Sequence, residues 1–306
     1  MPRTVVITGC STGFGYLAAL RFARQGDRVY ATMRGVDGKN HGPASALRKA
    51  AADEGIDLRV LEMDVASDAS VNAAAETVLS ESGAPDAVIN NAGQMYMGLT
   101  EAFTPDELAR QLDVNVVGIH RVSRAFLPAM RENGDGLVIN VSSVAGRFGA
   151  PLFGVYHASK WAVEGYSLGF RTELASAGVD VVVVEPGPFT TELFPRTPQP
   201  ADEEGRAATY PAALHAATEG MGAAFEQLFA SDEVNTDPDL VVNRFIELVD
   251  MAPGTRPFRS LVGFDFGVVG PMNDAAEPLY GQLYEAMGLA DVAVINQLTG
   301  EFSFVD

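Results

Sequence analysis

The 306-residue sequence has few residues that could form covalent or metal cross-links. Cys10 is its only cysteine, which excludes an intrachain disulfide and a cysteine metal cluster. Because Cys10 lies in a glycine-rich turn where a small side chain suffices, we interpret it as structural rather than nucleophilic. The four histidines, His41, His120, His157 and His215, lack the spacing of metal ligands, so we expect no metal site.

Positive charge is also scarce, with 21 Lys and Arg against 40 Asp and Glu and a formal net charge of −19. Because phosphate backbones and anionic membrane surfaces attract basic proteins, we expect neither a nucleic acid nor a membrane as a partner. No apolar run approaches the ~18 residues of a membrane-spanning helix, and the N-terminus leads into a strand pattern without a signal peptide. These absences predict a cytoplasmic globular protein.

Short apolar runs alternate with longer segments of helical period over about the first 190 residues. The runs expected to form buried strands are Thr4–Thr8, Arg28–Met33, Leu58–Met63, Ala87–Asn90, Leu137–Val141 and Val179–Glu185. The segments expected to form helices are Gly13–Gln25, Pro43–Glu54, Asp68–Ser80, Thr104–Glu132 and Tyr156–Ala177. This alternation predicts an α/β fold with a doubly wound, mostly parallel sheet and helices on both faces.

The chain changes character after residue 187. The expected elements there are a proline-rich loop over 195–211, a helix at Ala212–Ala230, another from about Thr236, a seventh strand at Arg259–Phe264 and a helical tail at Pro271–Asp306. No internal repeat or low-complexity linker divides the sequence. We therefore expect a single domain over residues 1–306, with a cap insertion at about 189–235 and a C-terminal extension at about 271–306.

A glycine-rich turn follows the first strand and opens the first helix. Gly9 suits a tight turn, Gly13 the close approach of a ligand to the backbone, and Gly15 close contact between helix and strand. Amide groups at the helix start would face a pyrophosphate. A glycine triplet alone also fits a structural turn, but Asp64 and Asn90–Gly93 follow the third and fourth strands, at the edge where open α/β sheets bind ligands. Together these residues predict a dinucleotide site.

Tyr156 and Lys160 are four positions apart in a helical segment, so their side chains point to the same side. A tyrosine has a pKa near 10, and we expect the lysine ammonium and an oxidised nicotinamide to lower it. Tyr156 could then exchange a proton with a carbonyl or alcohol oxygen. Ser143, thirteen residues before Tyr156, would hydrogen-bond the same oxygen. This constellation predicts a protein that moves a hydride.

The motifs resemble those of the short-chain dehydrogenase/reductase family in order and spacing, over about residues 4–190 and the strand near 260. They are Thr8-Gly-x3-Gly-x-Gly15, Asp64, Asn90-Asn-Ala-Gly93, Asn115, Ser143, Tyr156-x3-Lys160 and Pro186-Gly187. The resemblance implies a Rossmann-type fold with a seven-stranded sheet and a homodimer or homotetramer. The Thr-Gly-Cys-Ser opening and the Tyr-Ala-Thr-x-Arg second strand are similar to a subgroup that includes hydroxysteroid and retinol dehydrogenases.

The resemblance also assigns roles to residues. It implies that Ser143 rather than Ser142 takes part in catalysis with Tyr156 and Lys160, and that Asn115 holds a water-mediated proton route to the lysine. The implied cofactor contacts are Gly9, Ser11, Thr12, Gly13, Phe14, Gly15, Arg34, Asp64, Val65, Asn91, Ala92, Gly93, Tyr156, Lys160, Pro186, Gly187, Phe189 and Thr191.

The second strand bears on the choice of nicotinamide cofactor. Met33 stands where NAD-preferring members of the family usually have Asp, and Arg34 could pair with a 2′-phosphate. A solvated arginine beside a turn is the other interpretation of Arg34. The second basic residue that many NADP-preferring relatives carry in the glycine turn is absent, since Thr12 occupies its place. The sequence favours NADP(H), with NAD(H) possible.

The expected substrate is an apolar or aromatic ketone, aldehyde or secondary alcohol. The residues expected to border it are Gln94, Met95, Tyr96, residues 149–155, Phe189 and Phe194, with Phe148, Phe153, Met221 and Phe225 adding apolar surface. The alternatives are a non-catalytic nucleotide-sensing protein and an NAD-dependent alcohol dehydrogenase. A dehalogenase-like lyase would lack the glycine turn, and an epimerase would space its glycines differently.

Overall fold

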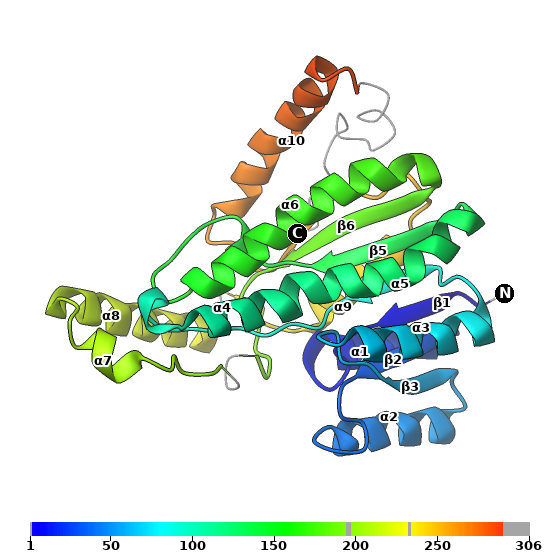
Figure 1. The fold of residues 1–306 in the computed structure, drawn as a ribbon, viewed down its shortest axis with the longest axis horizontal. Coiled ribbons are helices and arrows are strands. Elements are labelled where there is room, and N and C mark those ends of the chain that lie inside the picture. The colour runs from blue at the N-terminus through cyan, green and yellow to red at the C-terminus, as the bar shows by residue number, and fades with distance from the viewer. Residues whose placement is uncertain (1, 194–196, 232–233, 290–306) are drawn as a thin grey trace.

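The computed structural model describes residues 2–193, 197–231 and 234–289 (Figure 1). Its centre is a seven-stranded sheet in the order β3-β2-β1-β4-β5-β6-β7. The strands are β1 (Thr4–Ile7), β2 (Arg28–Met33), β3 (Leu58–Glu62), β4 (Ala87–Asn90), β5 (Gly136–Val141), β6 (Val179–Pro186) and β7 (Arg259–Val262). Every neighbouring pair is parallel, which confirms the predicted doubly wound α/β fold and makes the sheet parallel throughout.

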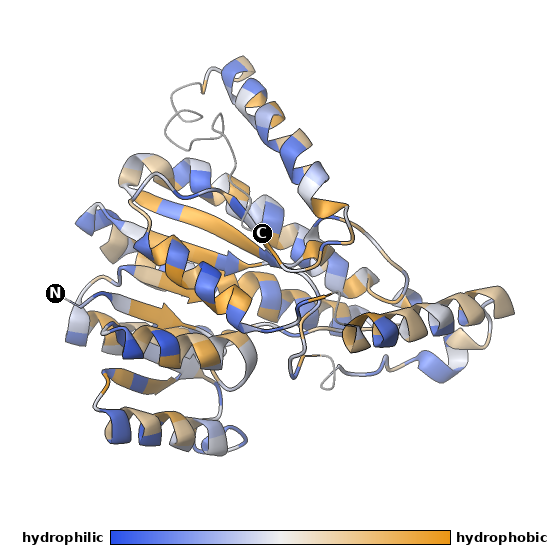
Figure 2. Cartoon of the chain, turned by 180° about the vertical axis from the view of Figure 1, so that it is seen from behind, coloured by the Kyte–Doolittle hydropathy of each residue, from blue (hydrophilic) through white to orange (hydrophobic). Residues whose placement is uncertain are grey.

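Helices cover both faces of the sheet, whose strands are largely hydrophobic (Figure 2). The α-helices of the described residues are α1 (Gly13–Arg24), α2 (His41–Glu54), α3 (Asp68–Ser82), α4 (Pro105–Leu112), α5 (Gly118–Asn133), α6 (Gly154–Leu174), α7 (Glu203–Ala207), α8 (Ala212–Ala230), α9 (Asp239–Asp250) and α10 (Val269–Ala286). Successive strand residues point to opposite faces. Ile7 packs with Phe22 of α1 and Phe245 of α9, whereas Val6 packs with Phe126 of α5 on the other face. Each such burial stabilises the fold by about 2 kcal/mol.

The strand order creates a crevice at one edge of the sheet. From β1 the chain continues to β2 and β3 on one side, and then crosses to β4, β5, β6 and β7 on the other. The connections after β1 and β4 therefore leave the sheet in opposite directions and separate at their carboxyl ends. Ligands of doubly wound sheets bind at this point.

The long helix predicted at Thr104–Glu132 is confirmed as a continuous helical stretch from Pro105 to Asn133, but its middle is π-helical rather than α-helical. Its start is as expected, because Thr104 and Glu107 form a capping box and Pro105 occupies the first turn. However, α4 ends at Leu112, and residues Asp113–Val117 form a π-helical segment before α5 begins. The wider π turn adds a residue to one turn, which the apolar periodicity of a sequence does not reveal. The segment carries Asn115, one of the predicted site residues.

The segment after β6 contains α7 and α8, which lie together beyond the edge of the sheet (Figure 1). This cap is tied to the connection between β4 and α4, because Asp202 N–H donates to Ala102 O (3.1 Å) and the Tyr210 hydroxyl donates to Glu101 (2.9 Å). At the other end of the chain, α10 projects away from the sheet, and the predicted tail beyond 289 lies outside the described residues. The single-domain organisation stays a prediction. No helix in the described ranges has both the length and the apolar composition to cross a membrane.

Candidate active site

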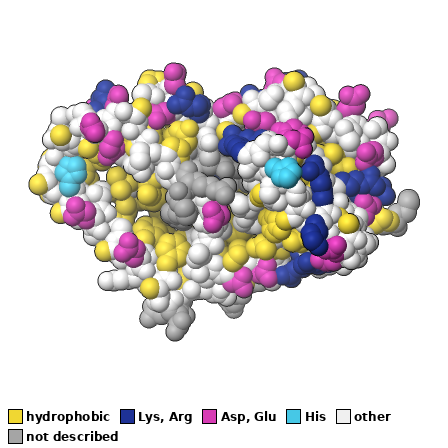
Figure 3. Space-filling view, turned by 90° about the horizontal axis from the view of Figure 1, so that it is seen from below, with side chains coloured by type: hydrophobic (Ala, Val, Ile, Leu, Met, Phe, Trp, Pro, Cys, Tyr) yellow, Lys and Arg dark blue, Asp and Glu magenta, His cyan; other side chains and the backbone are white. Residues whose placement is uncertain are grey.

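A cavity of about 1000 Å³ opens at the carboxyl ends of the central strands. The glycine-rich turn, the connections after β2 to β6, the start of α6 and the cap helix α8 all contribute to its lining. The face seen in Figure 3 is hollowed here, with hydrophobic side chains gathered around the hollow and charged side chains nearer the rim. The elements predicted to meet at this edge therefore enclose one space.

The glycine-rich turn packs tightly against the connection after β4. A Cβ atom on Gly9, whose φ is +73°, would lie 2.7 Å from Ala92 Cα. A Cβ on Gly15 would lie 2.5 Å from Asn91 Nδ2, which itself donates to Thr8 O (2.9 Å). Both positions therefore require glycine. The turn is fixed against β4 in the way that a dinucleotide site needs.

The start of α1 has the electrostatics of an anion site. The Thr12 side chain makes no capping hydrogen bond, and the first turn of the helix contains no acidic residue. The positive end of the helix dipole therefore reaches the cavity with no acidic side chain in the helix's own first turn to oppose it. Gly13, with φ +58°, would place a Cβ no closer than 3.8 Å to Thr191, so the cradle is open on its cavity side. These residues fit a pyrophosphate.

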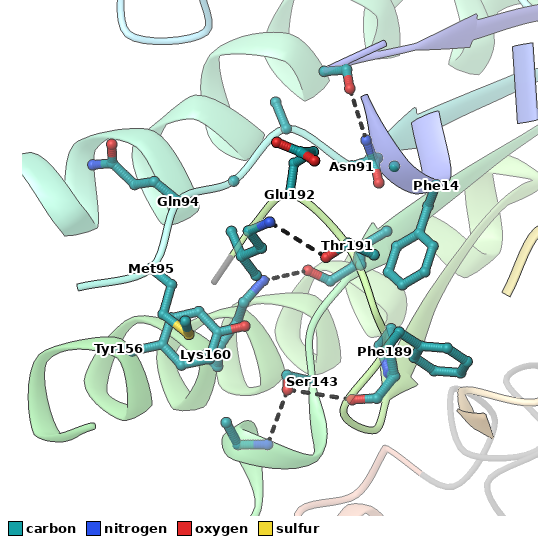
Figure 4. Close-up of a pocket in the computed structure, with 18 of the residues that line it drawn as sticks. Phe14, Asn91, Gln94, Met95, Ser143, Tyr156, Lys160, Phe189, Thr191 and Glu192 are labelled. Atoms are coloured by element: carbon teal, nitrogen blue, oxygen red, sulfur yellow. Dashed lines mark hydrogen bonds between the residues drawn. The ribbon is translucent and has the colours of Figure 1, made fainter. Parts of the chain in front are cut away.

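Three predicted catalytic side chains meet on one side of the cavity (Figure 4). Ser143 Oγ accepts a hydrogen bond from Ala145 N–H (3.1 Å) and donates one to Pro186 O (3.3 Å). Lys160 Nζ donates to Val141 O (2.9 Å) and lies 5.6 Å from the centroid of the Tyr156 ring. The last residues of β5 and β6 thus hold the serine and the lysine in place beside α6.

Burial controls the acid–base state of these groups. Burial raises the pKa of Tyr156 to about 12, although the contact with Ser143 acts in the opposite direction. Burial also lowers the pKa of Lys160 to about 8, against the attraction of Glu164. The loss of hydration therefore outweighs the contact with Ser143, and the lowering expected from the lysine ammonium together with an oxidised nicotinamide stays a prediction for the cofactor-bound protein. Tyr156 is a protonated donor at neutral pH.

Asn115 lies behind the cavity rather than in its lining. Its Oδ1 accepts from Gln94 N–H (2.9 Å), while its Nδ2 donates to Gln94 O (2.9 Å) and to Ser159 Oγ (3.0 Å). The π-helical segment directs this amide at the connection after β4 and at the residue before Lys160. Asn115 thus positions two parts of the site, and the water-mediated proton route to the lysine stays a prediction.

The cavity lining contains almost all of the predicted cofactor residues. They are Gly9, Ser11, Thr12, Gly13, Phe14, Arg34, Asp64, Val65, Asn91, Ala92, Gly93, Tyr156, Lys160, Pro186, Gly187, Phe189 and Thr191. Gly15 lies behind the turn instead. Asn90, the first residue of the Asn-Asn-Ala-Gly motif, points into the sheet, where its Nδ2 donates to Asn140 Oδ1 (2.9 Å).

Many of the predicted substrate residues line the cavity. They are Gln94, Met95, Phe148, Phe189, Met221 and Phe225, together with Ala150 and Phe153 from residues 149–155. The prediction that Tyr96 borders the substrate is wrong, because Tyr96 is buried against Phe103 with ring centroids 5.7 Å apart. Phe194 lies outside the described residues. Among the described residues, no group of three or more His, Cys, Asp or Glu side chains could hold a metal ion.

Sequence reasoning missed Lys39 and Asn40, which line the cavity beside Arg34. The turn after β2 folds back on itself: Asn40 Nδ2 donates to Arg34 O (2.6 Å), and Asn40 N–H donates to Gly35 O (2.9 Å). The glutamate that ends β3, Glu62, accepts from Gly35 N–H (2.7 Å) and further anchors this turn. The available signal was the glycine at position 35, which permits the positive φ that the turn adopts, but the placement of Lys39 depends on the folded turn.

Comparison with known proteins identifies the family. The family profile described as short chain dehydrogenase matches residues 3–201. Retinol dehydrogenase 8 from Homo sapiens is 32% identical over 260 residues, which cover 84% of this chain and 79% of that protein. 17-beta-hydroxysteroid dehydrogenase type 1 from Homo sapiens is 42% identical over 198 residues, or 63% of this chain and 59% of that protein, so this match spans less than two thirds of its length.

A solved structure agrees with these matches. The gluconate 5-dehydrogenase from Burkholderia cenocepacia, in complex with NADP and tartrate, superposes with a TM-score of 0.58 at 30% identity, covering 69% of this chain and 76% of that one. The matched profile spans the sheet from β1 to β6, including the glycine turn and the Ser143, Tyr156 and Lys160 positions. The chain therefore belongs to the short-chain dehydrogenase family.

Proposed function

We propose that the protein is an NADP(H)-dependent oxidoreductase that interconverts a carbonyl and an alcohol on an apolar or aromatic substrate. The observation that carries the proposal is that Ser143, Tyr156 and Lys160 line the same cavity as the glycine-rich turn. A buried phenol beside an ammonium is suited to proton transfer, and the turn is suited to a dinucleotide. Neither feature alone would specify this reaction.

The residues around the turn fit a nicotinamide dinucleotide. The open cradle at Gly13 and the start of α1 would hold the pyrophosphate. Phe189 packs edge-on against Phe14 with centroids 5.5 Å apart, so the connection after β6 lies against the turn, where it could close over the nicotinamide. Bound there, the cofactor would supply a hydride to the carbonyl carbon or accept one from the alcohol.

The proton is handled by the chain's own residues. Tyr156, protonated because its pKa is raised to about 12, donates to the oxygen of the carbonyl as that oxygen gains charge. Ser143 stabilises the same charge by turning its hydroxyl from Pro186 O toward the substrate. Lys160, with a pKa of about 8, is mostly an ammonium at neutral pH and stabilises the phenolate that remains.

The substrate side of the cavity is aromatic. Phe225 of α8 lies 6.4 Å from Phe153 and 6.0 Å from Phe266, and Phe266 lies 5.7 Å from Phe148, all between ring centroids. These four rings come from the segment before α6, from the cap and from the connection after β7. They support an apolar or aromatic substrate, because burial against aromatic rings favours apolar surface.

The test is a panel of aldehydes, ketones and secondary alcohols measured with NADPH, NADH and the oxidised cofactors. We expect nicotinamide absorbance to change with aromatic and long-chain apolar substrates, and to change little with small polar ones. The matched control is each substrate without enzyme. If NADPH binds but no carbonyl or alcohol is turned over, the protein is a nucleotide sensor and the proposal is wrong.

The preference for NADP(H) rests on two cations beside the cavity. Lys39 lies across Gly35, since its Cγ would be 3.3 Å from a Cβ there, and Gly35 directly follows Arg34. Lys39 thus supports the NADP(H) proposal as the second basic group that the glycine turn lacks. Arginine and lysine together suit a 2′-phosphate, which NADP carries and NAD does not.

Removing these charges tests the cofactor preference. In Arg34→Met and in Lys39→Met, we expect the KM for NADPH to rise about 10-fold to 100-fold, because each variant loses one hydrogen bond between a charged side chain and the 2′-phosphate. The KM for NADH should stay unchanged, because NADH has no 2′-phosphate. Lys49→Met is the matched control, since Lys49 pairs with Asp53 on the exposed side of α2 and is not among the residues that line this cavity.

Introduction of a carboxylate at the end of β2 should also weaken the preference for NADPH. We expect Met33→Asp to shift the NADPH to NADH preference toward NADH, because a carboxylate repels the phosphate and can accept from ribose hydroxyls. Equal KM changes for both cofactors in all three variants would contradict the assignment. Assembly as a homodimer or homotetramer and a cytoplasmic location stay predictions.

A further inference from the structure

A histidine beside the proposed proton donor has no part in the chemistry above. His157 follows Tyr156 on α6, and the helical period turns its side chain about 100° away from that of the tyrosine. It is only 7% exposed. A buried polar ring of this kind needs hydrogen-bond partners, and both of its partners lie in residues 144–150, the loop between Ser143 and α6.

The imidazole bridges the two ends of this loop. His157 Nδ1 lies 2.7 Å from Ala145 O, and Nε2 lies 2.9 Å from Ala150 N. The carbonyl can only accept and the amide can only donate. Nδ1 therefore carries the proton, and Nε2 keeps its lone pair for the amide. The partners fix His157 as the neutral Nδ1–H tautomer, with both ring nitrogens in use.

One residue joins this bridge to the serine. The carbonyl of Ala145 accepts from His157, and the N–H of Ala145 donates to Ser143 Oγ (3.1 Å). Because this amide occupies one lone pair of the serine oxygen, the hydroxyl proton of Ser143 points away from the amide. In this structure it is donated to Pro186 O (3.3 Å). The direction in which Ser143 donates thus depends on the placement of Ala145.

The other end of the bridge supports the substrate wall. Ala150, Phe148 and Phe153 all line the cavity. The Phe148 and Phe153 rings pack edge-on against His157, with centroid distances of 5.6 Å and 5.9 Å. Displacement of the imidazole would therefore move the serine and part of the aromatic wall together.

We propose that His157 is a positioning residue, which holds loop 144–150 so that Ser143 and the Phe148 side of the cavity face the substrate. The inference rests on the proposed function for its effect on turnover, but the bridge itself does not. A misplacement of about 1 Å at a reacting group costs on the order of 100-fold in rate, which sets the scale of the effect.

The variants His157→Leu and His157→Gln separate the hydrogen bonds from the bulk of the ring. Leu fills space but leaves Ala145 O and Ala150 N–H without partners, whereas the Gln amide can donate to the first and accept from the second. In His157→Leu we expect kcat to fall about 10-fold to 100-fold and KM to rise, with the Kd for NADPH unchanged. In His157→Gln both kcat and KM should return most of the way to their wild-type values.

A double-mutant cycle with Ser143→Ala shows whether the effect on kcat passes through the serine. In the Ser143→Ala background, His157→Leu should lower kcat little further but should still raise KM through the aromatic wall. A full, independent loss of kcat in that background would overturn the link to Ser143. Wild-type kcat and KM in His157→Leu would overturn the proposal as a whole.

Two readouts do not depend on turnover. Amide hydrogen exchange at Ala145 and Ala150 should accelerate in His157→Leu and return toward the wild-type rate in His157→Gln. If the Leu variant does not fold, nitrogen NMR of the wild-type imidazole decides, since it must show a protonated Nδ1 and an unprotonated Nε2. The opposite tautomer, or unchanged exchange in a folded Leu variant, refutes the bridge. A wild-type protein with this tautomer but without turnover on any substrate would refute the proposed function alone.

Discussion

Replacement of Tyr156 by Phe is expected to lower kcat for carbonyl reduction by about 10²-fold to 10⁴-fold, the contribution of a positioned proton donor. The variant removes one oxygen from a buried phenol whose raised pKa of about 12 keeps it protonated. It retains the ring, which packs with Met95, Ala145 and Phe153 and faces the Lys160 ammonium at 5.6 Å. Fold and NADPH binding should therefore be preserved while turnover is lost.

Tyr166→Phe is the matched control, because it removes a second tyrosine hydroxyl from the same helix. The Tyr166 hydroxyl lies 3.1 Å from His120 Nδ1, between α5 and α6, and does not line the cavity. Its loss should cost about 1 kcal/mol of stability and leave turnover near the wild-type value. Turnover measured by nicotinamide absorbance and binding measured by nicotinamide fluorescence check both variants. Wild-type kcat in Tyr156→Phe would contradict the assignment of the proton donor.

Local patterns predict the parts of this site that lie close together in the chain. Tyr156 and Lys160 are four residues apart on a helix, so the helical period alone places them on the same side. Gly9 and Gly15 are required where the turn contacts Ala92 and Asn91, and a turn between a strand and a helix already predicts such contacts. Strands were similarly predictable, because buried parallel strands consist of almost uninterrupted apolar residues.

Features that depend on tertiary packing were missed or predicted incorrectly. The raised pKa of Tyr156 follows from the burial of its phenol, which depends on how the cavity packs and which the helical spacing of Tyr156 and Lys160 does not reveal. The approach of Lys39 to Gly35, the residue after Arg34, depends on a folded turn held by Glu62 of the neighbouring strand. The bridge made by His157 joins backbone atoms, which no side-chain pattern reveals.

A buried ionic cluster behind the site also depends on tertiary packing. It connects α10 to α6, the helix that carries Tyr156 and Lys160. Arg259 of β7 donates to Glu164 of α6 (2.9 Å) and to Glu277 of α10, and it lies 3.7 Å from Glu185 of β6. Asn273 of α10 also donates to Glu185 (2.5 Å). Since Glu164 follows Lys160 by one helical turn, the C-terminal helix is attached to the helix that carries the proposed proton donor.

Arg259→Met is expected to destabilise the protein by about 3–5 kcal/mol, because it leaves buried carboxylates without their main counter-charge. Burial raises the pKa of Glu185 well above its usual range and raises that of Glu277 as well. In the wild-type protein Arg259 opposes both increases. Methionine has a similar volume but no charge, so the variant tests the charge rather than the packing.

The loss of stability in Arg259→Met should depend on pH, and the raised pKa values determine in which direction. Some carboxyls have a higher pKa in the folded protein than in the unfolded protein. Such a carboxyl contributes its full stability when the pH is below its pKa in the unfolded protein. That contribution is lost as the pH rises through its pKa in the folded protein. Without Arg259 the folded pKa values of Glu185 and Glu277 rise further. At about pH 5 the carboxyls can accept protons, so the destabilisation by Arg259→Met should be smaller there than at about pH 8.

Urea unfolding of both proteins at the two pH values measures these differences. Arg24→Met is the matched control, because Arg24 pairs with Glu54 on the surface, with both side chains more than a third exposed, so its loss should change stability little. If Arg259→Met does not fold, Arg259→Lys keeps the charge and should lose less stability. An Arg259→Met variant as stable as Arg24→Met, or one destabilised equally at both pH values, would show that the charge of Arg259 does not hold α10 and α6 together.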